Sequence, residues 1–125
     1  MTSTNITNAT VFDATGAAAF AGHVRIEGNR IAHVVRAGQG DLPPAERIID
    51  ASGKFLMPGM VEGHAHLSFG NAASTDAIIA PSPEAHVFIT AQGAKDLIDA
   101  GFTSAYGASE AKLRLGVAVR DAVNA

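Results

Sequence analysis

Two histidines one residue apart, His64 and His66, are the side chains in this sequence best suited to chemistry. They end a short run that enters on Pro58-Gly59. On an extended strand, residues i and i+2 face the same side, so the two imidazoles would lie side by side. Two neutral imidazoles make half of a transition-metal site. The alternative is chance, because the chain holds five histidines and two of them could fall at this spacing without binding an ion.

A few other polar residues are candidates for a site around this pair. Glu62 shares the face of the histidines, where it would orient an imidazole or pair with a neighbouring strand. Ser104 and Tyr106 lie towards the end of a later strand and could line a substrate pocket, although core packing is the expected role of Tyr106. His23 and His33 are expected to be structural or solvated. His86 is expected in the first turn of a helix, with contact to a substrate as the lesser alternative.

Composition excludes several classes of protein. The 125 residues match the size of one domain, and 47% of them are apolar, enough for a core. The net charge is −3 and the nine Lys and Arg are scattered, so no nucleic-acid partner is expected. Without cysteine, a metal ion would be held by nitrogen and oxygen. Neither a secretory signal nor a membrane span is recognisable, so we expect a cytoplasmic protein.

The first half of the chain has the pattern of β-strands. Val24 and Ile26 alternate with polar neighbours, and Gly28-Asn29 supplies a two-residue turn to a returning strand. A Gly/Pro-rich loop follows. We expect strands at 9–13, 23–27, 30–35, 47–51 and 55–57.

The second half alternates strands and helices. We expect strands at 60–66 and 102–106, with helices from 83 and from 115. Ser82 is the expected N-cap of the first helix, which Gly101 would end, and its apolar face should carry Val87, Ala91, Ala94 and Ile98. This order implies parallel strands joined by a right-handed crossover. The long loop at 67–81 is expected to be functional.

These patterns suggest an α/β chain in two parts. Residues 1–57 form a β-sandwich segment, and 58–125 form the first two βα units of a larger barrel. A (β/α)8 barrel takes about 250 residues, and two parallel strands cannot cover both faces of a sheet. The last helix also lacks a stop signal after Val123. We therefore expect the fold to be incomplete within this chain.

Several of these motifs together resemble the amidohydrolase superfamily. The resemblance lies in the β-rich start, in Asp50-Ala51-Ser52-Gly53-Lys54 and above all in the run from Pro58 to His66. Gly101-Phe102-Thr103-Ser104 is similar to the start of the family's second barrel strand. The segment 115–122 looks like the second helix of its imidazolonepropionase and Xaa-Pro dipeptidase-like branch. The resemblance covers about residues 9–125.

The resemblance implies a metal-dependent hydrolase built on a (β/α)8 TIM barrel beside a small β-sandwich. His64 and His66 match the paired histidines that bind a divalent metal, usually zinc, as one or two ions. The family's other ligands and its aspartate base lie on later strands. No catalytic residue therefore falls within this segment, which alone should be inactive.

The implied function is hydrolysis of amide C–N bonds by metal-activated water, with dipeptide-like or N-acyl amino-acid substrates. The expected partners are this small-molecule amide and the polypeptide that supplies the rest of the barrel. Assembly into a homo-oligomer stays open, and no membrane partner is expected. The rival function is a non-catalytic β-sandwich or interaction module, or one half of a split protein.

Overall fold

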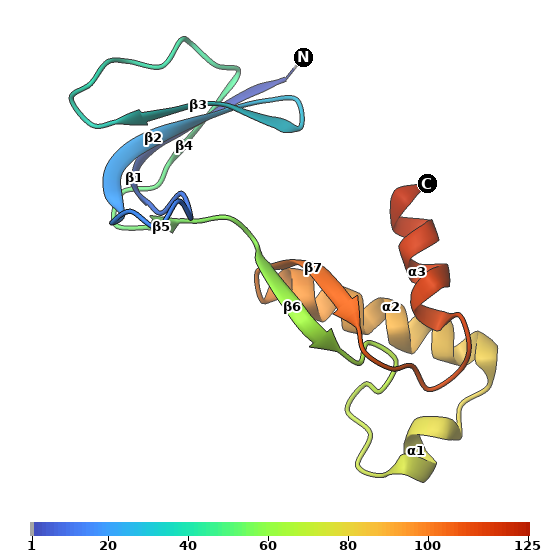
Figure 1. Cartoon of the computed structure of the whole chain (residues 1–125). Coiled ribbons are helices and arrows are strands. Elements are labelled where there is room, and N and C mark those ends of the chain that lie inside the picture. Colours follow the sequence, from blue (N-terminus) through green and yellow to red (C-terminus); the bar gives the residue numbers. More distant parts are fainter. Residues whose placement is uncertain (1) are drawn as a thin grey trace. The chain divides into compact units, whose positions relative to one another are not determined.

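The computed structural model describes residues 2–125, and the chain divides after Pro58 into two compact units. Each unit has a sheet of its own (Figure 1). The structure is thus a mixed α/β chain. Among residues 2–125, no helix is long and apolar enough to cross a membrane.

The first unit is a sheet of five strands in the order β3-β2-β1-β4, with β5 also paired to β1. Strand β1 runs antiparallel to β2 and parallel to both β4 and β5. The strands are β1 (Ser3–Val11), β2 (Phe20–Glu27), β3 (Arg30–Arg36), β4 (Arg47–Asp50) and β5 (Phe55–Leu56). The expected hairpin is confirmed, with Glu27 opposite Arg30 and Gly28 at φ +58° in the turn.

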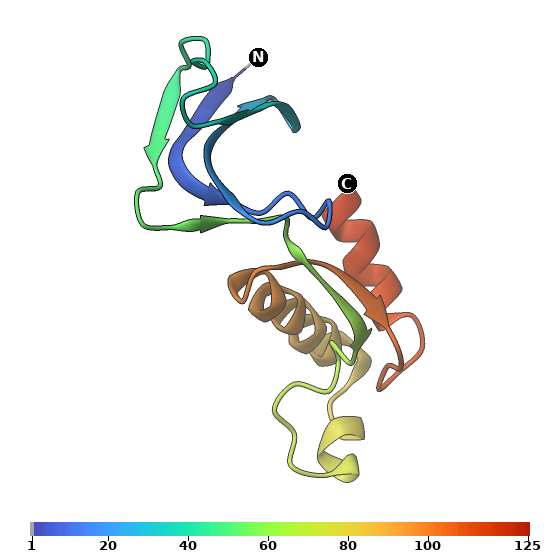
Figure 2. The ribbon, with the colours of Figure 1, turned by 60° about the vertical axis from the view of Figure 1, so that its left-hand side comes forward.

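Strand β1 differs from the expectation of a strand at 9–13, because it begins at Ser3 and ends at Val11. Its first half is polar, but it gains ladder hydrogen bonds on both sides, from β2 and from β4. Pairing on two edges outweighs the weak strand propensity of these residues. The register with β2 slips between Ile6 and Ala9, where Asn8 takes φ +60°. Figure 2 shows β1 bending, as a β-bulge makes a strand do.

The core of the first unit lies on one face of this sheet. Its buried members come from β1, β2 and the residue after β4, and three partly buried side chains pack against them. They are Ala9, Val11, Val24 and Ala51, with Ile6, Phe20 and Leu56 around them.

Arg25 is a buried charged residue of the first unit, only 8% exposed. Its Nη1 donates hydrogen bonds to the Asn5 side chain and to the carbonyls of Pro43 and Pro44, at 3.0–3.2 Å. Its Nε donates to Glu27 at 2.7 Å. A buried guanidinium with these acceptors fixes the Gly/Pro-rich loop against the sheet.

The second unit contains one pair of parallel strands and three helices: β6 (Met60–Ala65), α1 (Thr75–Ile79), α2 (Pro83–Asp99), β7 (Phe102–Gly107) and α3 (Leu115–Asn124). The parallel pairing of β6 with β7 confirms the expected βα order. The long loop at 67–81 holds α1, a short helix. The Ser74 hydroxyl caps α1 by accepting from the Ala77 amide at 3.2 Å.

Helix α2 begins and ends where the sequence predicts. The Ser82 hydroxyl accepts from the Ala85 amide, Pro83 opens the helix and Gly101 follows it at φ +91°. The expected apolar face is wrong, because Val87 and Ile98 are 37% and 59% exposed. The buried residues are His86 and Thr90 instead. Helix α2 packs on β7 and α3, while its buried His86 contacts the carbonyl of Ser68 in the loop after β6.

Candidate metal centre

The two histidines lie where β6 ends, with His64 in the strand and His66 just beyond it. Their ring centroids are 5.0 Å apart and the ring planes make an angle of 77°. His64 is exposed and His66 is half-buried. Parallel strands of α/β folds bind ligands at their carboxyl ends, which is where this pair lies. Two imidazoles this close can approach a single ion.

His66 is held by two contacts that leave one of its nitrogens free. Its Nδ1 lies 3.2 Å from the carbonyl oxygen of Ser109, in the loop after β7. A carbonyl only accepts, so this hydrogen bond places the ring proton on Nδ1 and the lone pair on Nε2. The ring also stacks on Phe69, with centroids 4.5 Å apart and an interplanar angle of 9°. This is the tautomer and support that a metal-binding imidazole requires.

Glu62 is close to the pair, but it contacts the main chain. Its Oε1 accepts a hydrogen bond from the backbone amide of His64 at 3.0 Å. The carboxylate therefore fixes the strand that carries the ligand candidates. No hydrogen bond joins it to an imidazole ring in the part of the chain that the structure describes.

A cavity of about 280 Å³ brings three of the predicted residues together. Its walls come from the end of β6, the loop that follows and one side of α2. The lining residues are Glu62, His64, Ala65, His66, Leu67, Gly70, Asn71, Gly93, Asp96 and Leu97.

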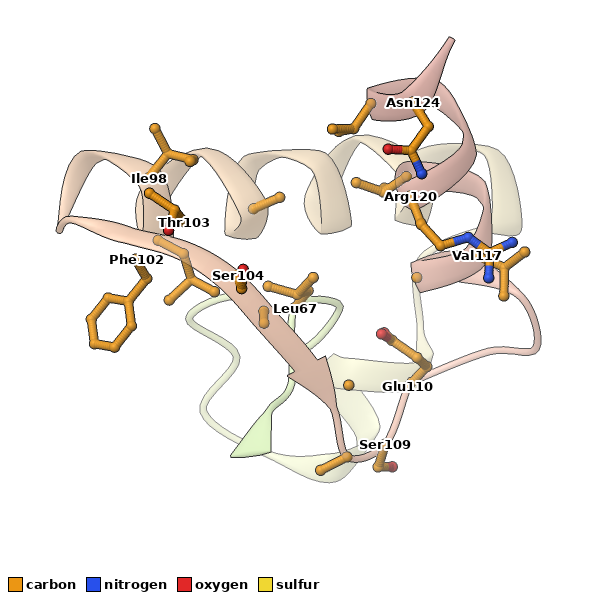
Figure 3. Close-up of a pocket in the computed structure, with 18 of the residues that line it drawn as sticks. Leu67, Ile98, Phe102, Thr103, Ser104, Ser109, Glu110, Val117, Arg120 and Asn124 are labelled. Atoms are coloured by element: carbon orange, nitrogen blue, oxygen red, sulfur yellow. The ribbon is translucent and has the colours of Figure 1, made fainter. Parts of the chain in front are cut away.

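Ser104 lies in a different place from the histidine pair. It lines a larger cavity of about 680 Å³ between β7, α2 and α3, whose wall is mostly apolar (Figure 3). Tyr106 lines neither cavity and is 72% exposed, so it packs into no core formed by residues 2–125. A role for either residue with a substrate stays a prediction.

The donor set in residues 2–125 is smaller than a complete metal site. These residues contain no group of three or more His, Asp, Glu or Cys side chains arranged to hold a metal ion. Catalytic zinc sites have about three protein ligands. The histidine pair thus fits part of a site, and further ligands would have to come from other polypeptide.

Sequence reasoning missed a buried polar cluster beside the pair. His86, Thr90 and Ser68 are each 0–1% exposed, although all three are polar. His86 and Thr90 are four residues apart on α2, with Gly93 three further on, so they share one face. This row of two polar residues and a glycine could have predicted the buried face of α2, but the apolar residues at helical spacing on the same helix indicated another face.

The loops that follow β6 and β7 are also joined to each other. The Ala108 amide donates to the carbonyl of Ala65 at 2.9 Å, beside the contact of His66 with Ser109. Further along, Lys112 Nζ donates to the carbonyl of Ile79, the last residue of α1, at 2.7 Å. These contacts connect the segment from Ala65 to Ile79 with the loop after β7.

None of the known family models matches the chain. Sequence comparison finds relatives whose alignment covers part of it. An imidazolonepropionase of Treponema denticola is 35% identical over 80 residues, which are 60% of this chain and 19% of that protein. An adenine deaminase of Listeria monocytogenes is 38% identical over 53 residues, 42% of this chain and 8% of that one. A D-hydantoinase of Streptomyces coelicolor is 40% identical over 57 residues, 42% and 12% of the two chains.

Solved structures match almost the whole chain. Molinate hydrolase superposes with a TM-score of 0.82 and 25% identity over 98% of this chain and 27% of its own. A prolidase complexed with N-methylphosphonate-L-proline gives 0.76 and 28%, over 98% and 29%. A Xaa-Pro dipeptidase gives 0.84 at 22% identity, over 98% and 30%, a likeness of fold. The chain spans less than a third of each of these proteins.

Proposed function

The chain belongs to the amidohydrolase superfamily and corresponds to its N-terminal portion, and on this basis we propose that it supplies the first metal ligands of a hydrolase that cleaves amide C–N bonds. Hydrolysis of the amidohydrolase type is the activity common to its relatives. Dipeptide-like or N-acyl amino-acid substrates are the finer proposal. The likeness to a prolidase at 28% identity supports that class.

We propose that residues 58–125 form the first two βα units of a (β/α)8 barrel and that residues 1–57 form strands of a β-sandwich. The parallel pair of β6 and β7 supports this assignment. So does the exposure of large apolar side chains in the second unit, among them Val61 at 69% and Phe88 at 77%. In this proposal another polypeptide segment covers them and adds the remaining strands.

His64 and His66 would hold the divalent metal, for which zinc is the proposed identity. When bound, such an ion polarises a carbonyl and lowers the pKa of water enough to provide hydroxide near neutral pH. The residues of this chain would bind and orient. The Ser109 carbonyl keeps the lone pair of His66 on Nε2, and Glu62 holds the backbone of His64. Proton transfer to the leaving amine would fall to a residue outside this chain.

The observation that carries the proposal is the placement of two imidazoles, 5.0 Å apart, at the carboxyl end of a parallel strand. The test is metal analysis of the protein expressed from its complete reading frame. His64→Ala and His66→Ala should each lower bound zinc and abolish hydrolysis of Xaa-Pro dipeptides and N-acyl amino acids. His33→Ala is the matched control, since it removes an exposed histidine of the first unit. Zinc content that is equal in all four proteins would refute the proposal.

A second candidate is one half of a split protein, or a non-catalytic module. The incomplete donor set in residues 2–125 favours it. A split protein would co-purify with a second polypeptide and bind zinc only in the complex. A module would fold as a monomer, bind no metal and hydrolyse nothing.

A further inference from the structure

The buried polar cluster of His86, Ser68 and Thr90 joins helix α2 to the loop that follows the histidine pair. The three residues are 1%, 0% and 0% exposed. Burying a polar side chain costs free energy unless it is hydrogen-bonded. The partners of these side chains therefore indicate what the cluster does.

His86 is the member of the cluster whose side chain bonds to a residue outside its own helix. Its ring Nε2 lies 2.9 Å from the carbonyl oxygen of Ser68. Because a carbonyl only accepts, Nε2 carries the proton in this contact. The hydroxyl of Thr90, in contrast, donates to the carbonyl of His86 at 2.8 Å, within the same helix. Thr90 therefore stabilises the helix, whereas His86 holds the loop.

Ser68 carries the connection on to the second loop. Its hydroxyl accepts a hydrogen bond from the Ala111 amide at 2.8 Å. Ala111 is two residues after Ser109, whose carbonyl contacts Nδ1 of His66. Ser68 is likewise two residues after His66. Hydrogen bonds thus connect His86 on α2 to the imidazole of His66, through Ser68 in the first loop and the segment from Ser109 to Ala111 in the second.

We infer that His86 is a positioning residue, which fixes Ser68 and, through it, the orientation of His66. The inference rests on the proposed metal site for its functional consequence and on the hydrogen bonds alone for its structural part. A metal-binding ring must be held by the groups around it, and loss of such a group typically weakens metal binding by ten- to a hundredfold. His86 acts two hydrogen bonds further out than the Ser109 carbonyl, through Ala111 and Ser68, so the lower end applies.

Variants at three positions separate positioning from packing in the protein expressed from its complete reading frame. His86→Leu fills the space but removes the donor. His86→Gln keeps an amide N–H that can reach the Ser68 carbonyl, and so serves as the rescue. Thr90→Val is the matched control, because it removes a buried hydroxyl that donates within its own helix. Ser68→Ala breaks the next link without changing His86.

Hydrogen exchange gives the readout that needs no metal. His86→Leu should speed amide exchange in residues 66–70 and 109–112, and Ser68→Ala should do so at Ala111. His86→Gln and Thr90→Val should leave these segments as in the wild type. Unchanged exchange in His86→Leu would overturn the inference.

Zinc affinity, measured by competition with a chelator, gives the second readout, with the Co²⁺ absorption spectrum as its signature. His86→Leu and Ser68→Ala should weaken zinc binding about tenfold and alter the spectrum, while His86→Gln and Thr90→Val should not. Equal loss in Thr90→Val would overturn positioning, because it would show a general effect of packing. Altered exchange in a protein that binds no zinc at His64 and His66 would refute the proposed function and leave the structural role of His86 standing.

Discussion

Replacing Gly93 by alanine should displace the backbone next to the histidine pair. A Cβ at Gly93 would lie 2.4 Å from the carbonyl oxygen of Leu67, and ordinary contact begins at 3.4 Å. Helix α2 and Leu67 would therefore have to separate by about 1 Å. The atom in the way belongs to the main chain and cannot rotate aside. Since Leu67 directly follows His66, the displacement reaches the metal-ligand candidates.

Two opposing effects set the size of the change. Alanine is favoured over glycine in a helix interior by about 0.8–1 kcal/mol. Forcing an extra methyl group into a packed site costs about 1–3 kcal/mol. We expect the second effect to win, so that the free energy of unfolding falls by up to about 2 kcal/mol.

Gly116→Ala in α3 is the matched control. A Cβ there would lie 2.6 Å from Oε1 of Glu110, which is the end of a flexible side chain. The carboxylate can rotate away, so this variant should keep the helix-propensity gain without the clash. The difference between the two variants isolates the overpacking cost, about 1–3 kcal/mol.

The assay is urea denaturation of the complete protein, followed by circular dichroism, with zinc affinity measured on the same samples. Gly93→Ala should unfold at lower urea and bind zinc less tightly than Gly116→Ala. Neutral surface substitutions change the free energy of unfolding by up to about 0.5 kcal/mol. If the free energies of unfolding of the two variants agree within this range, the close approach of α2 to Leu67 is wrong.

Three further predictions concern other parts of the chain. The Ser52 hydroxyl and then the Asn8 amide hold the pKa of Asp50 below its ordinary value, so Ser52→Ala should raise that pKa in an NMR titration. The stability that Asp50 contributes is present above the ordinary pKa of an aspartate and is lost as the pH falls through the lowered pKa of Asp50. The loss of stability in acid should therefore be smaller in Ser52→Ala than in the wild type. Arg25→Met should speed amide exchange in the loop at 38–46, because the carbonyl of Pro44 loses its Arg25 donor and that of Pro43 loses one of two donors, the other being the Asn5 side-chain amide; the exposed Arg30→Met should not. Residues 1–125 purified alone should self-associate and bind a hydrophobic dye, since Leu113 and Phe88 are 95% and 77% exposed; a monomer that unfolds cooperatively would contradict this.

Elements with local signals could be predicted from the sequence. The β2–β3 hairpin follows from Gly28-Asn29, and the ends of α2 follow from Ser82 and Gly101, because turns and caps depend on a few neighbouring residues. Strand β1 could not be delimited in this way. Its polar start is a strand because β4, more than 40 residues later, pairs with it.

In the candidate site, too, features set by neighbouring residues could be predicted and contacts between distant residues could not. The spacing of His64 and His66 is local, so their proximity could be predicted. The contact of His66 with Ser109 is made by a backbone carbonyl. Every residue has this group, so the contact cannot be predicted from the type of residue 109. The burial of His86 was hidden for a related reason, because its partner is the main chain of Ser68.

The hydrogen bonds between the two loops limit how this region can be re-engineered. Ala65, Ser68 and Ile79 in or beside the first loop each depend on a donor from the second, at Ala108, Ala111 and Lys112 respectively. Shortening or grafting one loop alone would leave the main-chain and hydroxyl groups of the other without partners. A graft that transfers residues 65–81 together with 107–114 keeps every one of these pairs. Loop exchange between homologues should therefore succeed as a two-segment cassette and fail one segment at a time.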